Sequence, residues 1–298
     1  MRALYQQSSL QTICGLFGRS RQSWYHLEES TSSRVLKKEL VIELVEQIRS
    51  DLPKTGTIKL QSMLKDTFKD HRIAMGRDSL FTLLREENML IKHKKRYTST
   101  TNSHHHFRVW PDLVNRRAST RAEEIWVSDI TYLRTQNGFI YLSLITDAYS
   151  RKIVGYHLSH NLKASGPFKA FNMAFKNRVY PKRKLIHHSD RGIQYCCTEY
   201  VQLLLNNNVA ISMTQNGSPY DNAIAERVNG ILKGEFGLSE TFSSYNHALA
   251  NLVTSIDKYN KLRRHFSCDL KTPQQRHNEF IVTEKSLLQI QNKIGQPM

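Results

Sequence analysis

Two aspartates stand at positions where a carboxylate could do chemistry. Asp129 lies inside the apolar run IWVSDITYL, which predicts a β-strand, and a charge buried in such a strand is costly unless something compensates for it. Asp190 follows the strand-like segment LIHHS and precedes Arg191-Gly192, where the glycine permits a sharp turn beside the carboxylate. Ligand sites in α/β sheets cluster at such carboxyl ends of strands. Both aspartates are therefore expected to face a ligand such as a metal ion.

A third acidic residue, Glu226, lies in a predicted helix with a clear start. Ser218 is expected to be the N-cap, Pro219 the first helical residue, and Asp221 the partner of Ser218 in a capping box. Helical spacing then gives one polar and one buried stripe, and Glu226 points away from the core. The polar stripe consists of Asn222, Glu226, Asn229 and Lys233, and the buried stripe of Ile224, Val228, Ile231 and Leu232.

Three carboxylates delivered from two strands and a helix suit a pair of Mg²⁺ ions about 3.5 to 4 Å apart. Such a pair polarises a scissile phosphate, activates the attacking hydroxyl and stabilises the leaving oxygen. Phosphoryl transfer needs few other groups, because the protein mainly positions the reactants and offsets charge. Asp129, Asp190 and Glu226 are therefore predicted to be both the catalytic residues and the metal ligands.

The segments around these residues predict an α/β domain over residues 121–240, followed by a C-terminal helical extension over residues 241–298. Two strand-like runs flank Asn137-Gly138, which is a strong hairpin signal. Three antiparallel strands followed by alternating helices and strands predict a mixed sheet, in the order of the ribonuclease-H-like (RNase-H-like) fold. The later elements are a helix over 168–178, a strand over 185–189, a helix over 194–207, a strand over 209–213 and a helix from Pro219.

The N-terminal part of the chain predicts all-α, helix-turn-helix domains. In residues 1–30, apolar residues at helical spacing stop at Gly18, and Ser20 can cap a second short helix. Arg19 in the turn and Arg21 in that second helix are expected to reach DNA phosphates or base edges. The alternative is a helical hairpin with no DNA contact.

Residues 35–90 predict three short helices with an apolar core, a helical DNA-binding domain of winged-helix or homeodomain size. The alternative is a helical bundle used for packing or dimerisation. Residues 91–120 form a predicted basic linker along the phosphate backbone, in which His104–His106 fit a solvated loop better than a metal site. The linker residues predicted to contact DNA are Lys92, Lys94, Lys95 and Arg96.

The composition points to a polyanionic partner. The 298 residues include 43 Lys and Arg against 26 Asp and Glu, a formal net charge of +17, and both halves of the chain are basic. Nucleic acid fits this distribution, and the alternative is a generally basic soluble protein. The four cysteines match neither a disulfide framework nor a zinc motif, and no stretch resembles a secretory leader or a membrane span. A soluble, cytoplasmic protein without a membrane partner is expected.

The spacing of the carboxylates is the most specific signal. Sixty residues separate Asp129 from Asp190, and 35 separate Asp190 from Glu226. This resembles the DD(35)E arrangement of retroviral integrases and bacterial insertion-sequence transposases. The surrounding segments resemble the OrfB-type transposases with an integrase core, and the resemblance covers roughly residues 35–275. Those segments are WVSDITYL, LITDAYSRKIVGY, HHSDRGIQY, SMTQNGSPYDNAIAERVNGILKGEF and YNKLRRHFSCDLKTP.

The resemblance implies a DDE-type polynucleotidyl transferase with an RNase-H-like core and two Mg²⁺ or Mn²⁺ ions per active site. It assigns metal binding to Asp129, Asp190 and Glu226, and it implies strand cleavage and strand transfer at insertion-sequence ends. The implied partners are double-stranded DNA (terminal inverted repeats and target DNA), further copies of the chain, and an upstream-frame DNA-binding protein or fusion. The implied location is the bacterial cytoplasm, at the nucleoid.

Five further basic residues are predicted to contact DNA phosphates. Arg191, Arg227 and Lys233 flank the carboxylates, while Arg263 and Arg264 belong to the downstream segment YNKLRRHF.

Four other polar residues have structural explanations. Asp147 could be a fourth carboxylate, as in ribonucleases H, but it fits a strand-end turn before AYSRK and is left out of the metal set. Strand alternation points one of His187 and His188 inward and the other outward, and packing or hydrogen bonding is favoured over catalysis. His265 is assigned to helix-end packing.

Two other functions stay open. A sequence-specific DNA-binding regulator without catalysis would explain the charge but not the burial of Asp129. An RNase-H-like nuclease would cut without joining, and the N-terminal helical units argue against it.

Overall fold

The computed structural model describes residues 9–91, 108–115, 117–215 and 222–279. The chain divides into two compact units, Met1–His93 and Lys94–Met298. The linker residues predicted to contact DNA and the three consecutive histidines lie outside the described residues. These are Lys92, Lys94, Lys95, Arg96 and His104–His106.

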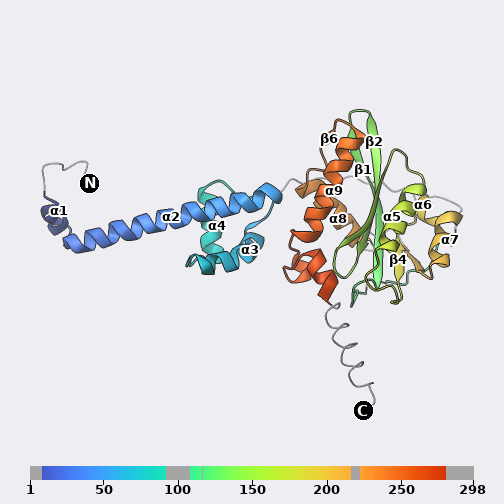
Figure 1. Cartoon of the computed structure of the whole chain (residues 1–298), viewed down its shortest axis with the longest axis horizontal. Coiled ribbons are helices and arrows are strands. Elements are labelled where there is room, and N and C mark those ends of the chain that lie inside the picture. Colours follow the sequence, from blue (N-terminus) through green and yellow to red (C-terminus); the bar gives the residue numbers. More distant parts are fainter. Residues whose placement is uncertain (1–8, 92–107, 116, 216–221, 280–298) are drawn as a thin grey trace, which may run out of the picture. The chain divides into compact units, whose positions relative to one another are not determined.

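The described elements of the N-terminal unit are helices (Figure 1). The helices are α1 (Leu10–Leu16), α2 (Arg21–Asp51), α3 (Thr57–Asp70) and α4 (Arg77–Glu86). Ser20 caps α2 as predicted, because its hydroxyl accepts a hydrogen bond from the backbone N–H of Ser23 at 3.1 Å. The second half of α2 packs with α3 and α4 around one apolar core, which holds these three helices together. Its most buried members are Val41, Val45, Leu60, Leu80, Leu83 and Leu84.

The predicted boundary between residues 1–30 and 35–90 is wrong, because α2 runs through it as one helix of 31 residues. The expected short helix after Ser20 and the expected first helix of the second domain are therefore the same element. Neither proline nor glycine occurs between Arg21 and Asp51, so no residue in this segment breaks the helix. Arg19 and Arg21 are both exposed beside the turn, and DNA contact through them stays a prediction.

A mixed sheet forms the centre of the second unit, as predicted for an RNase-H-like core (Figure 1). The strand order is β3-β2-β1-β4-β5, with β6 paired to the end of β1. The pairs β1–β2 and β2–β3 are antiparallel, whereas β1–β4 and β4–β5 are parallel. The strands are β1 (Ile125–Thr135), β2 (Gly138–Asp147), β3 (Ile153–Ser159), β4 (Ile186–Ser189), β5 (Ala210–Met213) and β6 (Thr241–Phe242). Gly138 in the predicted hairpin turn has φ +115°, a backbone conformation that favours glycine.

Helices cover both faces of this sheet (Figure 1). On one face, α5 (Ser165–Lys176), α6 (Ile193–Cys196) and α7 (Thr198–Asn206) pack around Trp126 and Phe171. On the other face, α8 (Ala223–Glu235) and α9 (Tyr245–Lys261) pack against Leu142 and Leu144 of β2 and Leu133 of β1. None of the described helices is long and apolar enough to cross a lipid bilayer.

Residues 241–298 are not a separate extension, at least as far as residue 279, where the description ends. Four residues of α9 spaced along one face are buried in the core beneath the sheet: Ala248, Leu252, Ile256 and Tyr259. The predicted domain boundary at residue 240 is therefore wrong. The amphipathic face of α9 cannot be separated from the sheet without exposing this apolar surface.

Helix α8 begins later than predicted. Its N-cap is Asn222 and its first residue is Ala223, whereas Ser218, Pro219 and Asp221 lie outside the described residues. The side chain of Asn222 does not cap the helix. Its amide instead donates to the backbone carbonyl of Ser128 at 3.1 Å, which ties the start of α8 to strand β1.

Candidate active site

The site forms at a gap along one edge of β1. On that edge, β1 pairs with β4 as far as Ser128, and it pairs with β6 from Arg134 onward. On this edge, no described strand pairs with the intervening stretch, which begins at Asp129, whereas the opposite edge of β1 pairs with β2. Asp129, whose buried charge was predicted to need compensation, thus lies where the pairing along this edge of the sheet is interrupted. A ligand can approach at this interruption.

The parallel pairing of β1 and β4 brings the two predicted aspartates to the same place. Ser128 and Ser189 are register partners, so Asp129 and Asp190 each follow one member of the same pair. Asp190 Oδ1 accepts the backbone N–H of Gly192 at 3.0 Å, and a Cβ added at Gly192 would lie 3.0 Å from that oxygen. A larger residue at position 192 would therefore crowd the carboxylate.

Helix α8 adds the third carboxylate and a residue that the sequence analysis did not select. Glu226 lies exposed in the first turn of α8. One turn later, the Asn229 amide donates to Asp129 Oδ2 at 2.7 Å. Asn229 is only 6% exposed, because its face of the helix is turned toward β1. The available signal was its place on the same polar stripe as Glu226.

The electrostatics of the site favour a bound cation. Burial and the charge of Asp190, with a smaller contribution from Glu226, raise the pKa of Asp129 to about 7, although hydrogen bonds from Asn229 and from the Ile130 backbone oppose the shift. Burial and Asp190 also raise the pKa of Glu226. The three carboxylates therefore repel one another, and a divalent cation would relieve that repulsion.

The donor atoms also fit a hard cation. The buried Oδ1 atoms of Asn222 and Asn229 have no hydrogen-bond partner, and the carboxylates add further oxygens, which are the ligands that Mg²⁺ prefers. Among the described residues, however, no group of three or more His, Cys, Asp or Glu side chains lies close enough to hold a metal ion. The charge of Asp190 raises the pKa of Asp129 and of Glu226, but the three carboxylates do not lie close enough together to surround a metal ion.

We expect metal-free protein to lose stability as the pH rises through about 7. The pKa of Asp129 is raised from 3.8 to about 7 by folding, so the resulting stabilisation is complete below about pH 4 and is lost as the pH rises through about 7. Asp129→Asn removes this titration. In EDTA, the stability advantage of the variant should be larger at pH 8 than at pH 5.5 by about 2 kcal/mol, measured by urea unfolding. An equal advantage at both pH values would contradict the assignment.

Removing the Asn229 carboxamide is expected to weaken the site. Asn229→Ala leaves Asp129 without its 2.7 Å hydrogen bond, and loss of a group that orients a metal ligand typically costs about 10- to 100-fold in metal affinity or activity. The measurement is the Mg²⁺ concentration required for half-maximal DNA cleavage. Asn251→Ala is the matched control, because Asn251 is exposed and its amide donates to the His247 carbonyl of its own helix α9. Equal Mg²⁺ requirements for the two variants would contradict the role of Asn229.

The basic residues that flank the carboxylates have different environments. Arg227 is exposed on α8. Arg191 is half-buried, and its guanidinium donates to the Thr214 carbonyl at 2.6 Å. The ammonium of Lys233 lies 4.5 Å from the centre of the Tyr132 ring. Burial lowers the pKa of Lys233, while Asp129 raises it. DNA contact by Arg191, Arg227 and Lys233 stays a prediction.

The structure disfavours the predicted DNA contact of Arg263, because its side chain is buried in an ion pair. Arg263 is 5% exposed, and both of its hydrogen bonds to the Glu235 carboxylate measure 2.6 Å. Its third nitrogen bonds His265 Nε2 at 2.8 Å, which confirms helix-end packing for His265. Arg264 is half-buried, and its contact with DNA stays a prediction. Arg263 instead joins the ends of α8 and α9.

Both histidines of β4 are buried, which corrects the prediction that one of them points outward. Strand β4 is central and is covered on both sides, so alternation sends its side chains into two different buried environments. His187 Nε2 lies 2.9 Å from the Tyr200 hydroxyl, and His188 Nδ1 lies 2.8 Å from the Ser212 hydroxyl. The preference for hydrogen-bonded over catalytic histidines agrees with these contacts.

Asp147 has the turn role that was predicted for it. It is fully buried at the end of β2, and its carboxylate accepts hydrogen bonds from the Ser150 backbone and hydroxyl and from the Glu123 backbone. These bonds close the turn between β2 and β3. Asp147 therefore belongs to the structure of the sheet rather than to the metal set.

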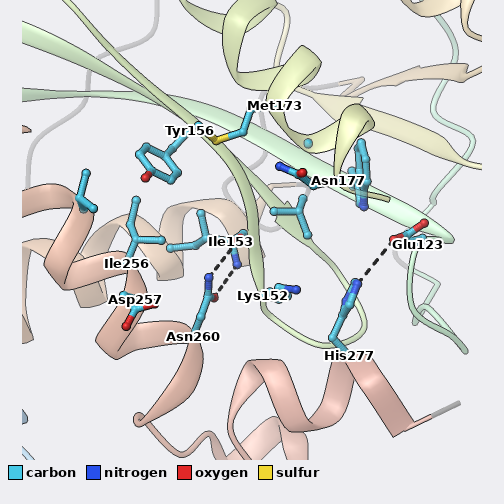
Figure 2. Close-up of a pocket in the computed structure, with 14 residues that line it drawn as sticks. Glu123, Lys152, Ile153, Tyr156, Met173, Asn177, Ile256, Asp257, Asn260 and His277 are labelled. Atoms are coloured by element: carbon cyan, nitrogen blue, oxygen red, sulfur yellow. Dashed lines mark hydrogen bonds and ion pairs between the residues drawn. The ribbon is translucent and has the colours of Figure 1, made fainter. Parts of the chain in front are cut away.

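A separate hollow of about 370 Å³ lies between α5, β3 and α9 (Figure 2). Asn260 of α9 holds both the N–H and the carbonyl of Ile153 at 3.0 Å, and His277 lies 3.6 Å from the Glu123 carboxylate (Figure 2). None of the three predicted catalytic carboxylates lines this hollow. Within the stretch YNKLRRHF, Asn260 and Arg263 dock the end of α9 against β3 and α8.

Comparison with known proteins places the chain in a family. Two models, both described as integrase core domain, match residues 119–219 and 207–273. An uncharacterized 31 kDa protein of insertion element IS600 from Shigella sonnei is 36% identical over 258 residues, covering 85% of this chain and 93% of that protein. The transposase InsF for insertion sequence IS3A of Escherichia coli is 33% identical over 198 residues, covering 66% and 68%.

Among solved structures, the simian T-cell lymphotropic virus intasome, in complex with a PP2A regulatory subunit, contains a similar chain. It matches with a TM-score of 0.46 and 18% identity, over 75% of this chain and 70% of that one. The family of the chain follows from its sequence relatives and from the two integrase core domain matches. The chain belongs to the insertion-sequence transposases that carry an integrase core domain, and it is a DDE-type polynucleotidyl transferase.

Proposed function

We propose that this transposase cuts and joins DNA at the ends of its own insertion sequence, with Asp129, Asp190 and Glu226 holding divalent metal ions. The observation that carries the proposal is the placement of Asp129 in a buried position at the open edge of β1, where burial first, then the charge of Asp190 and to a smaller extent that of Glu226, raise its pKa to about 7. A structural role would not favour three acidic groups near one another. A site that binds cations requires them.

The residues of the site have distinct parts in this proposal. Two Mg²⁺ or Mn²⁺ ions bound by the carboxylates would supply Lewis acidity and an activated hydroxyl. Asn229 holds Asp129 in place through its 2.7 Å hydrogen bond, and Asn222 fixes the start of α8 to β1. The protein thus contributes rigid placement of the oxygens, which is the main requirement of phosphoryl transfer.

The proposed substrates are the terminal inverted repeats and a target duplex. Positive charge is offered to DNA phosphates from both units, by exposed Arg227 on α8, by Arg19 in the turn before α2 and by Arg21 at the first position of α2. We further propose that copies of the chain assemble on the two ends, together with an upstream-frame DNA-binding protein or as a fusion with it. The net charge of +17 supports a polyanionic substrate.

A reconstituted reaction tests the function. Purified protein, with and without the upstream-frame product, is incubated with a plasmid carrying both element ends in Mg²⁺, in Mn²⁺ or in EDTA. Nicked and strand-transfer products are expected only with metal. Binding without metal-dependent cleavage under every condition would favour a regulator, and cleavage without joining would favour a nuclease.

A further inference from the structure

The free end of the β1–β2 hairpin carries aromatic side chains close to the active site. The rings of Tyr132 in β1 and Phe139 in β2 meet edge to face, with centroids 5.1 Å apart. Register and strand alternation place both on the face of the sheet that also carries Trp126, toward α5. Helix packing covers Trp126 fully, whereas Phe139 stays 49% exposed.

Two cations lie against these rings. The guanidinium of exposed Arg134 is 5.6 Å from the Phe139 centroid, and the Lys233 ammonium is 4.5 Å from the Tyr132 centroid. Lys233 comes from α8 on the opposite face of the sheet. It can reach Tyr132 because no described strand pairs with that edge of β1 between Ser128 and Arg134. We call Tyr132, Arg134, Phe139 and Lys233 the aromatic ledge.

The aromatic ledge and the carboxylates share the same gap in the sheet. Tyr132 is three residues along β1 from Asp129, a distance of roughly 10 Å at about 3.3 Å per residue. Helix α8 connects them on its polar stripe, where Asn229 bonds Asp129 and Lys233 lies over Tyr132. Strand alternation points the Asp129 side chain toward α8 and the Tyr132 ring toward α5. A DNA strand held at the carboxylates would therefore reach the ledge through the gap itself, along the edge of β1 that no described strand covers between Ser128 and Arg134.

We infer that the aromatic ledge binds unpaired bases of the DNA strand that occupies the active site. An exposed ring, Phe139, beside a half-buried one, Tyr132, both bordered by cations, suits single-stranded nucleic acid, since bases stack on the rings while the cations contact phosphates. Bases inside a duplex already stack on their neighbours, so the ledge selects ends at which bases have separated. This inference rests on the proposed function, because it takes DNA to be the occupant of the site.

A structural role alone would predict a different behaviour. A cross-strand aromatic pair with nearby cations contributes about 0.2–1 kcal/mol to a sheet, and that contribution does not depend on DNA. Substitution of Phe139 would then change the melting temperature and would leave the preference among DNA ends unchanged. The DNA preference therefore separates the two roles.

Binding to two DNA probes tests the inference. One probe is a blunt duplex, and the other is the same duplex with a short unpaired 3′ extension containing 2-aminopurine. Affinities are measured in EDTA, so that no strand is cut. The full chain is compared with Phe139→Leu, with the ring-preserving Phe139→Tyr, and with Phe266→Leu as a control for loss of an exposed aromatic side chain elsewhere, since Phe266 is 62% exposed.

We expect Phe139→Leu to bind the extended probe about 5- to 150-fold more weakly, the range for loss of one stacked base, and the blunt probe about equally. The quenching of 2-aminopurine by wild type should also be lost. Phe139→Tyr and Phe266→Leu should retain both properties. Equal weakening on the two probes, or no weakening, would overturn the inference. Because no cleavage is measured, this result is independent of whether the protein joins strands.

Discussion

Asp190→Asn and Glu226→Gln will each reduce strand cleavage and strand transfer by about 1,000-fold or more, while DNA binding remains within about threefold of wild type. The loss follows from removing one charged ligand of the metal ions, which supply several kcal/mol of transition-state stabilisation at about 1.4 kcal/mol per tenfold in rate. Binding should persist because phosphate contacts come from basic groups, such as exposed Arg227. Gel-based cleavage and fluorescence anisotropy on the same DNA measure the two effects.

The matched control for this experiment is an acidic residue outside the gap. Asp147→Asn is unsuitable, because the buried Asp147 carboxylate closes the turn after β2. Asp257 of α9 is better, since its ion pair with Lys261 is exposed on the surface, where such pairs contribute little. Asp257→Asn should keep wild-type cleavage. Full strand transfer by either Asp190→Asn or Glu226→Gln would refute the assignment of the metal ligands.

The aspartates could be predicted from sequence because each sits in a local pattern with one structural solution. The alternating and apolar runs around Asp129 and before Asp190 specify strands, and two parallel strands bring their equivalent ends together. The structure adds the register pair Ser128–Ser189 that aligns them. The open edge beside Asp129 was not predictable, because it depends on where the distant strand β6 rejoins β1.

Helical periodicity identified the stripe that carries Glu226, but it did not show what that stripe faces. A polar stripe is normally turned to water, so Asn229 was not selected, although it is buried against Asp129. The same limit explains α9. The spacing of Ala248, Leu252 and Ile256 predicts a buried face, but the spacing does not say that this face completes the core beneath β2.

The second large effect is expected for Arg263, which sequence reasoning assigned to DNA. Adjacent arginines in a basic chain are typical of phosphate contacts, and the partner that buries Arg263 is Glu235, 28 positions away. Nothing local to the YNKLRRHF segment reveals such a long-range pair. Only the fold brings the end of α8 against the end of α9 and makes the guanidinium part of the interior.

Arg263→Met is therefore expected to destabilise the catalytic unit by about 3 kcal/mol, because breaking a buried pair leaves the partner charge uncompensated. The melting temperature should fall by roughly 6–12 °C. Glu235→Gln should have a smaller effect of the same sign, since the Glu235 side chain is 29% exposed. Scanning calorimetry of the full chain measures both.

The control is the neighbouring arginine, Arg264, which is half-buried and whose DNA contact stays a prediction. Arg264→Met should change the melting temperature by less than about 3 °C and should reduce the salt dependence of DNA binding by about one phosphate contact. Measured well below its melting temperature, Arg263→Met should bind DNA with wild-type affinity and salt dependence. If Arg263→Met instead kept its stability and lost a phosphate contact, the guanidinium would have to leave Glu235 when DNA binds, and the ion pair would be a feature of the free protein alone.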